Sequence, residues 1–366
     1  MRSSPGDTVI PLLPRLFGGL LMLTGFVASA ADHCVVLQYQ HISDETPGVT
    51  SVSPELFQQH LDFLLENDHA VMPLEEVITA LKIGIELPER CVALTIDDAY
   101  TSAYTEAYPR LVRYDFPLTV FVSTEAVDRG LETHLSWEQM REMQTKGISF
   151  QNHSQSHGHL IRQHEGEGID DWEQRVAADI QIAQNRIEDE LGNLPTLFAY
   201  PYGEYNEALK KTVESMGLIG FGQQSGPLWR QADFTTLPRF PLASIYARMR
   251  AFSKKVASLP LPITGAFPED PVVPLDEWHP SLTLVFDPNV SDTKRLTCYL
   301  NGSSKVGYDW LDQPAGAVVV TPKGRLNVGR NRVACTLPVP GQEALAWYSH
   351  SWIRRHEDGS WYRESR

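Results

Sequence analysis

The chain has 366 residues and a formal net charge of −15, with 31 Lys and Arg against 46 Asp and Glu. A nucleic-acid partner is disfavoured, because such proteins need a basic surface. A neutral or amine-bearing glycan is compatible with this acidic balance.

The first thirty residues have the pattern of a secretory signal peptide. Arg2 and Arg15 precede an apolar stretch over residues 16–27, and an Ala-x-Ala site follows at 28–30. This order predicts export and cleavage after residue 30, which leaves a periplasmic or secreted protein. A membrane anchor is the alternative, but the apolar stretch is too short to span ~30 Å of hydrocarbon.

From residue 31 to about residue 260, short β-like runs alternate with segments of helical period. Ser136 and Gln139 form a capping box for a helix over 137–146, and a long apolar stripe over 172–191 ends at Gly192. Such alternation predicts a parallel sheet with helices outside it. The predicted strands lie at 35–39, 92–96, 118–122, 148–152, 196–200 and 218–221.

The composition changes after residue 260. Residues 261–280 contain five prolines, a linker composition. Residues 281–366 then contain short β-like runs between turn residues, which predict a small β-sandwich-like domain. The runs lie at 282–286, 296–300, 317–321, 332–337, 345–349 and 351–355.

The tryptophans of this C-terminal part have two interpretations. They suit a sugar-stacking platform, but aromatic residues in a sandwich more often form its core. We expect a structural role for this domain, or contact with an envelope or exopolysaccharide-export partner. The residues are Trp310, Trp347, Trp352 and Trp361.

Four cysteines in an exported chain allow three disulfide pairings. Cys34 and Cys91 each begin a similar apolar run, so neighbouring parallel strands in register would place their sulfurs side by side. Cys298 and Cys335 fall together in the C-terminal part. We predict the pairs Cys34–Cys91 and Cys298–Cys335, with four reduced, buried thiols as the alternative.

Two polar motifs follow predicted strands. The run 94–98 ends on the adjacent carboxylates of Asp97 and Asp98, and His153 and His157 come just after the strand at 148–152. Asp, His and His suit a divalent metal, and zinc in catalytic sites typically takes three protein ligands. Each motif alone has a simpler explanation, since an Asp after a strand is commonly a helix cap and a His pair commonly lies in a polar loop.

Three motifs taken in order carry a family resemblance. The segments 95–99 (Thr-Ile-Asp-Asp-Ala), 153–157 (His-Ser-Gln-Ser-His) and 200–203 (Tyr-Pro-Tyr-Gly) resemble the three signatures of the polysaccharide deacetylases of carbohydrate esterase family 4. The resemblance covers about residues 35–247 and is closest to the periplasmic poly-N-acetylglucosamine deacetylase branch. It implies an α/β fold that is a distorted, incomplete (β/α) barrel, followed here by the C-terminal β-sandwich-like domain.

The resemblance also implies a division of roles. Asp98, His153 and His157 would hold a divalent metal, with zinc preferred, and Asp97 would be the general base. The backbone N–H of Tyr202 would help to bind the oxyanion.

The sequence departs from the family pattern at several positions. Ile96 and Ala99 replace the usual Phe and Gly, no Arg precedes Pro201, and the late Leu-x-His that supplies the acid is missing. Arg239 is our candidate for a charge that orients the base, and His41 is our candidate for the catalytic acid.

The remaining histidines receive no role. His159 is expected in a loop beside the site. Five more are expected at the surface, and they are His69, His134, His164, His350 and His356.

These observations favour a metal-dependent hydrolase that removes acetyl groups from an N-acetylated, N-acetylglucosamine-type polysaccharide. Two alternatives remain open. One is an O-acetyl esterase that acts on a glycan with the same machinery. The other is a non-catalytic glycan-binding or matrix-assembly protein with a vestigial cleft.

Overall fold

The computed structural model describes Met1 and residues 30–363, apart from 291, 304–305 and 313–315. The predicted signal peptide, except its last residue and Met1, lies outside the described residues. Within the described part of the chain, no helix has the length and apolar character needed to cross a membrane.

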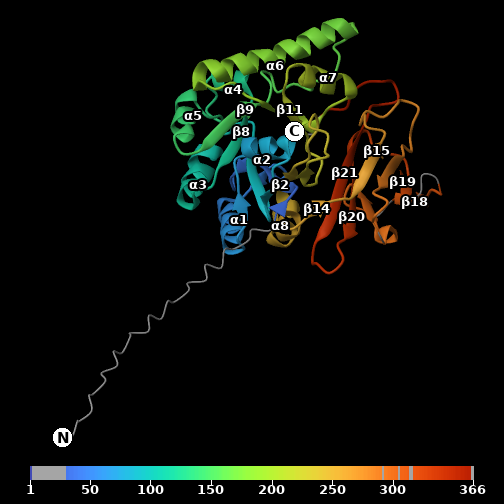
Figure 1. Cartoon of the computed structure of the whole chain (residues 1–366). Helices are drawn as coiled ribbons and strands as arrows, with labels where there is room; N and C mark the ends of the chain where they lie inside the picture. The colour runs from blue at the N-terminus through green and yellow to red at the C-terminus, as the bar shows by residue number, and fades with distance from the viewer. Residues whose placement is uncertain (2–29, 291, 304–305, 313–315, 364–366) are drawn as a thin grey trace.

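A curled, mostly parallel sheet forms the body of the molecule (Figure 1). Its main strands follow one another in the order β11-β10-β9-β8-β7-β2, and all of these pairs are parallel. The sheet does not close, so the prediction of an incomplete barrel is confirmed. These strands are β2 (His33–Tyr39), β7 (Cys91–Asp97), β8 (Leu118–Val122), β9 (Ile148–Asn152), β10 (Leu197–Ala199) and β11 (Ile219–Phe221).

Short strands extend this sheet or pair at its margins. β12 pairs antiparallel with the start of β2, whereas β13 runs parallel to its end. β5 pairs with β7, and the pairs β1–β6 and β3–β4 stand apart from the sheet. Their bounds are β1 (Ala30–Ala31), β3 (His41–Ile42), β4 (Ser51–Val52), β5 (Ala70–Val71), β6 (Leu87–Pro88), β12 (Leu228–Trp229) and β13 (Phe240–Pro241).

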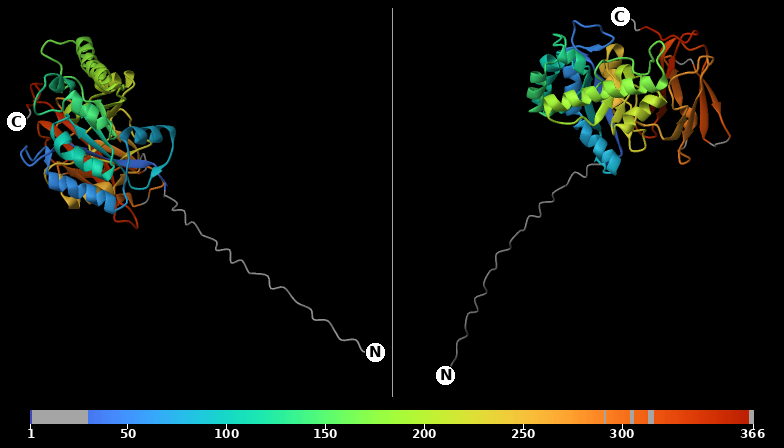
Figure 2. Two further views of the ribbon diagram at one scale, coloured as in Figure 1. Left: turned by 90° about the vertical axis from the view of Figure 1, so that its left-hand side faces the viewer. Right: turned by 90° about the horizontal axis from the view of Figure 1, so that it is seen from above.

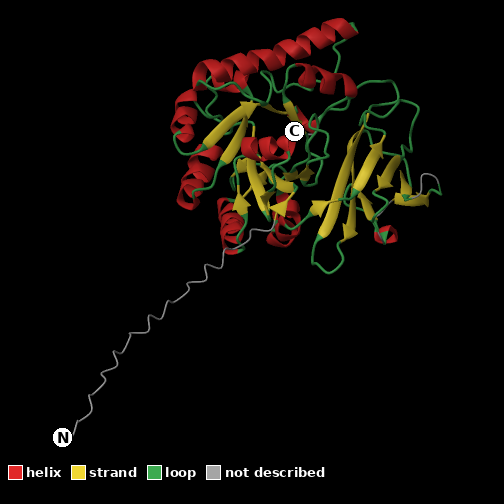
Figure 3. Cartoon of the chain, in the orientation of Figure 1, coloured by secondary structure: helices red, strands yellow, loops and turns green. Residues whose placement is uncertain are grey.

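Helices surround the outside of the sheet, as Figure 3 shows by colour. All seven residues of β7 are buried, which is expected for a parallel strand covered on both faces. The helices are α1 (Pro54–Glu66), α2 (Leu74–Ile83), α3 (Tyr108–Tyr114), α4 (Thr124–Asp128), α5 (Trp137–Gln144), α6 (Ile169–Leu191), α7 (Glu207–Ser215) and α8 (Met249–Val256).

Local sequence explains where two of these helices begin and end. The predicted capping box is present at the start of α5, where Ser136 accepts the N–H of Gln139 and the Gln139 side chain accepts the N–H of Ser136. The apolar stripe of α6 is buried, and the helix stops at Gly192, whose φ of 77° is left-handed.

The C-terminal part consists of two four-stranded sheets that lie to one side of the barrel (Figure 2, right). Their orders are β14-β21-β20-β17 and β15-β16-β19-β18. Inward residues of both sheets share one apolar core, and burial alternates along β20, which is the pattern of a sandwich. The strands are β14 (Leu259–Pro260), β15 (Ile263–Phe267), β16 (Leu282–Phe286), β17 (Thr297–Leu300), β18 (Val306–Trp310), β19 (Ala317–Pro322), β20 (Gly329–Pro338) and β21 (Leu345–Arg354).

Several C-terminal elements differ from the sequence-based expectation. The runs at 345–349 and 351–355 form one continuous strand, β21, because all its residues from Leu345 to Arg354 pair with β20. β15 lies within the stretch expected to be a linker and pairs with β16, and β18 was not predicted. His350, expected at the surface, is only 3% exposed because it lies within β21.

The four C-terminal tryptophans do not share one platform. Trp352 is buried in the sandwich core, and Trp310 packs against the same core. Trp347 instead meets Phe240 of the barrel edge to face, with ring centroids 5.2 Å apart. Trp361 lies beneath the guanidinium of Arg162.

Both predicted disulfides are confirmed. Cys34 and Cys91 join the starts of β2 and β7, which are neighbouring parallel strands. Cys298 and Cys335 lie directly opposite each other in the β17–β20 pair. Each bond therefore joins two strands of one sheet.

Candidate active site

The acidic and histidine motifs meet at the carboxyl end of the sheet. Asp97 is the last residue of β7, Asp98 follows it, and His153 follows β9. Nε2 of His153 lies 3.2 Å from Oδ1 of Asp98, and Nε2 of His157 lies 3.0 Å from the same oxygen. One ligand atom from each of these three residues lies within 4.8 Å of the other two.

The surroundings of this cluster fit a divalent cation. Nδ1 of His153 donates to the carbonyl oxygen of Ala199 at 2.7 Å, so Nε2 keeps its lone pair directed at Asp98. Among the described residues, Oδ1 of Asp98 is buried without a hydrogen-bond partner, while Oδ2 accepts from the side chain of Gln40. Two imidazoles and a buried carboxylate oxygen thus face the same point, which is a typical zinc donor set.

Charge balance within the cluster follows from burial and proximity. Burial alone would raise the pKa of Asp98, but the imidazoles of His157 and His153 outweigh it and hold that pKa well below its usual value. Burial lowers the pKa of His157, yet the Asp98 carboxylate more than compensates and the net pKa is raised. The carboxylate is therefore ionised at neutral pH.

Strained backbone is concentrated at this end of the sheet. Five non-glycine residues here have left-handed φ values, an arrangement that costs energy and persists where the surrounding structure enforces it. Ala99 occupies such a position, which Gly would adopt without strain. The values are 70° for Asp98, 58° for Ala99, 67° for Ser154, 51° for His157 and 60° for Tyr202.

Asp97 lies beside the cluster and is held by side chains of its own. The guanidinium of Arg239 donates two hydrogen bonds to its carboxylate, from Nη1 at 2.6 Å and from Nη2 at 2.9 Å. Nε2 of Gln38 donates a further bond at 2.6 Å. Arg239, the orienting charge suggested by the sequence, is therefore in contact with the candidate base. Gln38 was not predicted, since no pattern distinguishes it from other strand residues.

An aromatic row lies on another side of Asp98. The ring of His41 stacks on that of Tyr100 with centroids 3.8 Å apart, and Tyr100 in turn contacts His134 at 4.7 Å. Burial lowers the pKa of His41, and the Asp98 charge partly opposes this shift. His134, which was expected at an ordinary surface position, lines a cavity of about 180 Å³ together with Asp98 and His157.

Tyr202 lies in a tight turn over Pro201–Gly203 that follows β10. The imidazole of His159 stacks on the Tyr202 ring, with centroids 3.9 Å apart and planes 12° apart. The guanidinium of Arg330, from β20 of the C-terminal sandwich, lies 5.5 Å from the centroid of the same ring. The C-terminal part thus contacts the turn that carries Tyr202.

A buried carboxylate ties this turn to the C-terminal strands. The side chain of Glu204 is completely buried, and its Oε2 lies 2.8 Å from Nδ1 of His159. Its Oε1 accepts from Nη1 of Arg330 at 3.0 Å and from the hydroxyl of Tyr362. Burial raises the pKa of Glu204, but these partners, beginning with His159, lower it overall. Sequence reasoning missed Glu204, because its partners Arg330 and Tyr362 are 126 and 158 residues away.

The barrel and its site are similar to those of known polysaccharide deacetylases. The polysaccharide deacetylase family model matches residues 84–220. The chain is 29% identical over 205 residues to the putative polysaccharide deacetylase YxkH of Bacillus subtilis, covering 56% of this chain and 69% of that protein. It is 26% identical over 195 residues to the poly-beta-1,6-N-acetyl-D-glucosamine N-deacetylase of Staphylococcus epidermidis, covering 52% and 67%.

Solved structures show the same fold. The deacetylase PplD of Streptococcus pyogenes superposes with a TM-score of 0.55 at 25% identity, over 61% of this chain and 98% of that one. IcaB from Ammonifex degensii gives a TM-score of 0.54 at 24% identity, over 60% and 96%. Residues 84–220 therefore form a polysaccharide deacetylase domain, and the chain has additional strands beyond it.

Proposed function

We propose that this domain is a metal-dependent N-deacetylase that acts on an N-acetylglucosamine-type polysaccharide. The observation that carries the proposal is the convergence of Asp98, His153 and His157 next to an Asp97 carboxylate that is fixed by Arg239. The ligands alone would not indicate a hydrolase, because structural metal sites also have them. A hydrolase needs, in addition, a base beside the ligands that can accept a proton from water.

The ligand set implies zinc, or another divalent metal that accepts nitrogen and oxygen donors. When bound, such a metal polarises the acetyl carbonyl and lowers the pKa of a water molecule. Asp98, His153 and His157 would hold it, and the hydrogen bond from His153 to the Ala199 carbonyl keeps that imidazole in the correct tautomer.

The residues around this set perform the proton transfers. Asp97 accepts a proton from the attacking water, and its two bonds to Arg239 aim the carboxylate. The backbone N–H of Tyr202 stabilises the oxyanion. His41 donates a proton to the leaving nitrogen, which departs poorly unless it is protonated. Burial lowers the pKa of His41, so the proton that its ring passes to the leaving nitrogen is, in net terms, the one that Asp97 removes from the attacking water.

Domain organisation and location follow the same proposal. Residues 1–30 are a signal peptide and 31–260 the deacetylase domain. The stretch 261–280 connects the two domains and also supplies β15 to the sandwich, and 281–366 complete an accessory domain that contacts an envelope or export partner. Two disulfides support export to a periplasmic or extracellular setting, because such bonds are rare in the reducing cytosol. Two of the relatives named above are titled for deacetylation of a polysaccharide, which supports a substrate of that class.

The test couples metal analysis to acetate release from N-acetylglucosamine oligomers. His153→Ala should lose both stoichiometric metal and activity, because three protein ligands leave little redundancy. Asp97→Asn should keep the metal and lose about 10²-fold or more in turnover. His164→Ala, which alters an exposed histidine in the same segment, is the control and should keep both.

Four results would contradict parts of the proposal. Full metal occupancy in His153→Ala would show that His153 is not a metal ligand and would refute the proposed ligand set. Loss of metal in Asp97→Asn, with retention in Asp98→Asn, would mean that the two carboxylates have exchanged roles. Faster release from O-acetylated than from N-acetylated oligomers would identify a glycan esterase, and no release from either by the metal-loaded protein would favour a non-catalytic glycan-binding protein.

A further inference from the structure

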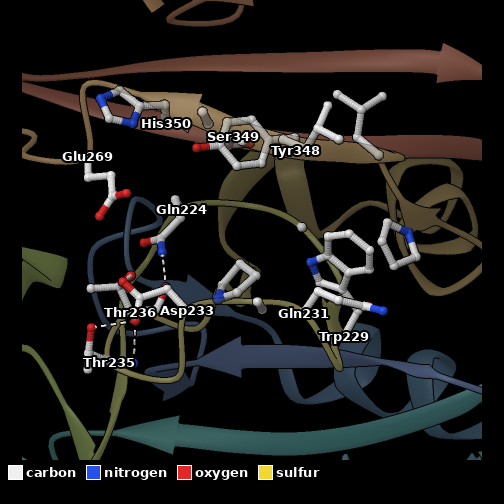
Figure 4. A pocket seen from close by; sticks show the side chains of 18 of the residues that line it. Gln224, Trp229, Gln231, Asp233, Thr235, Thr236, Glu269, Tyr348, Ser349 and His350 are labelled. Carbon is white, nitrogen blue, oxygen red and sulfur yellow. Dashed lines mark hydrogen bonds between the residues drawn. The ribbon is translucent and has the colours of Figure 1, made fainter. Parts of the chain in front are cut away.

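A second, larger cavity lies between the barrel and the C-terminal sandwich. Its volume is about 590 Å³, within the range of small-molecule sites. One wall comes from α7 and the loops around β12, and the other comes from β21 and the start of β15 (Figure 4). None of the residues of the Asp98 cluster lines it, so it is separate from the candidate active site.

Aromatic rings stand on both walls of this cavity. Trp229 comes from β12, whereas Trp347 and Tyr348 are neighbours on β21. Figure 4 shows Tyr348 on the wall opposite Trp229. All three side chains are only partly buried, in contrast to Trp352 in the sandwich core. Exposed aromatic faces inside a hollow are suited to packing against the apolar faces of sugar rings.

One end of the cavity carries an excess of negative charge. Nζ of Lys210 lies 2.8 Å from Glu207, 2.9 Å from Asp233 and 3.6 Å from Glu269. A single ammonium balances only one of the three carboxylates, and all three remain at least 40% exposed at the side chain. Lys211 and Glu214 also line the cavity and cancel each other, so this end keeps its negative character.

A buried polar group with an open hydrogen-bonding position lines the same space. His350 is 3% exposed, and its Nε2 has no hydrogen-bond partner among the described residues. Burial lowers the pKa of His350 to about 4, so the ring is neutral at pH 7 and offers one donor and one acceptor. Thr235 and Thr236 contribute hydroxyl groups from the opposite wall (Figure 4). These groups match the hydroxyls of a sugar.

We propose that this cavity binds a short segment of a glycan that carries free amino groups. The aromatic rings of Trp229 and Tyr348 pack on the sugar rings, and the carboxylates of Asp233 and Glu269 attract the ammonium groups. An N-acetylated sugar lacks that charge, so the cavity selects the deacetylated form. The proposal rests on the proposed function for the source of its ligand, because such a glycan is the product of N-deacetylation.

The experiment measures binding of glucosamine oligomers to the full chain, with Asp97→Asn as background to prevent turnover. Isothermal titration calorimetry would compare them with N-acetylglucosamine oligomers of equal length. Trp229→Ala should weaken binding of the amino form about tenfold, as expected for the loss of an aromatic contact. Glu269→Gln should weaken it by about two- to fivefold and reduce its salt dependence. Glu343→Gln, at an exposed site of the same sandwich outside the cavity, should leave it unchanged.

The outcomes separate this proposal from the proposed function. Unchanged affinity in both Trp229→Ala and Glu269→Gln would overturn the cavity as the binding site, even if the wild-type protein releases acetate. Equal affinity for the acetylated oligomers would overturn the selection for amino groups. If the two variants weaken binding as expected but the wild-type protein releases no acetate, the cavity remains the binding site and the proposed deacetylase activity is refuted. The charge variant lies at an exposed position, so it keeps the test valid if Trp229→Ala fails to fold.

Discussion

The ion pair between Arg239 and Asp97 allows a quantitative prediction about the stability of the protein. Arg239 is completely buried, and Asp97 is 2% exposed. Besides the two bonds to Asp97, the guanidinium donates from Nε to the Gly222 carbonyl at 3.1 Å. Among the described residues, Arg239→Ala would leave the buried Asp97 carboxylate with Gln38 as its remaining side-chain donor.

The size of the effect can be worked out from burial. Removal of one partner of a buried ion pair costs about 3–5 kcal/mol, because the remaining charge stays desolvated. For a domain of this size, each kcal/mol lowers the melting temperature by roughly 2–4 °C, so we expect a decrease of about 6–20 °C. Arg186 provides a matched control, since it also donates two bonds to one carboxylate, that of Asp128. That pair is about one third exposed, and its loss should cost at most about 1 kcal/mol.

Thermal unfolding followed by circular dichroism would measure both variants under the same conditions. A double variant, Arg239→Met with Asp97→Asn, removes both charges and should be more stable than Arg239→Ala alone. Equal melting temperatures for Arg239→Ala and Arg186→Ala would refute the reasoning. The same conclusion would follow if the double variant were the least stable of the three.

Three further predictions concern other parts of the molecule. Arg330→Ala should lower kcat by about 3- to 10-fold, with KM and metal content unchanged, because Glu204 loses a hydrogen-bond donor and holds the Tyr202 turn less firmly. The control is Arg325→Ala, which removes an arginine stacked on Trp278. Replacement of Cys34 and Cys91 by Ala should lower the free energy of unfolding by about 2–4 kcal/mol, measured by urea titration. The pKa of Glu204 is lowered on folding from 4.5, so its stabilising contribution is complete above that value and is lost as the pH falls through the lower folded value. The stability difference between the wild-type protein and Glu204→Gln should therefore shrink below about pH 4.5, and a difference that stays constant with pH would contradict this assignment.

The parts of the fold that were predicted from sequence depend on short-range patterns. The strands of the barrel are buried β-branched runs, and their period and length are visible without any tertiary information. The cysteine pairing was predictable for a related reason, since Cys34 and Cys91 each begin such a run and parallel register then places them together. β21 was wrongly divided because Ser349-His350-Ser351 looks like a polar break, yet every residue there pairs with β20.

The grouping of Asp98, His153 and His157 was predictable because parallel strands end at the same edge of a sheet. The support around them was only partly predictable. Arg239, 142 residues from Asp97, was suggested as the orienting charge because of the family resemblance, not because of a local pattern. The contacts of Glu204 were missed, since Arg330 and Tyr362 reach it from the C-terminal part. No local pattern records which distant side chain neutralises a buried carboxylate, since that depends on how the two units pack.

The Glu204 contacts bear on the purpose of the added strands. A freely tethered accessory module would need no buried charge at its junction, because an exposed polar surface costs nothing to leave in water. Here a completely buried carboxylate, two residues beyond Tyr202, depends on Arg330 and Tyr362 for its hydrogen bonds. Removing the sandwich would leave Glu204 with fewer partners and expose the apolar surface around it. Detachment of the C-terminal part is therefore expected to disturb the turn that carries Tyr202, the proposed oxyanion group, and not merely to remove a binding surface.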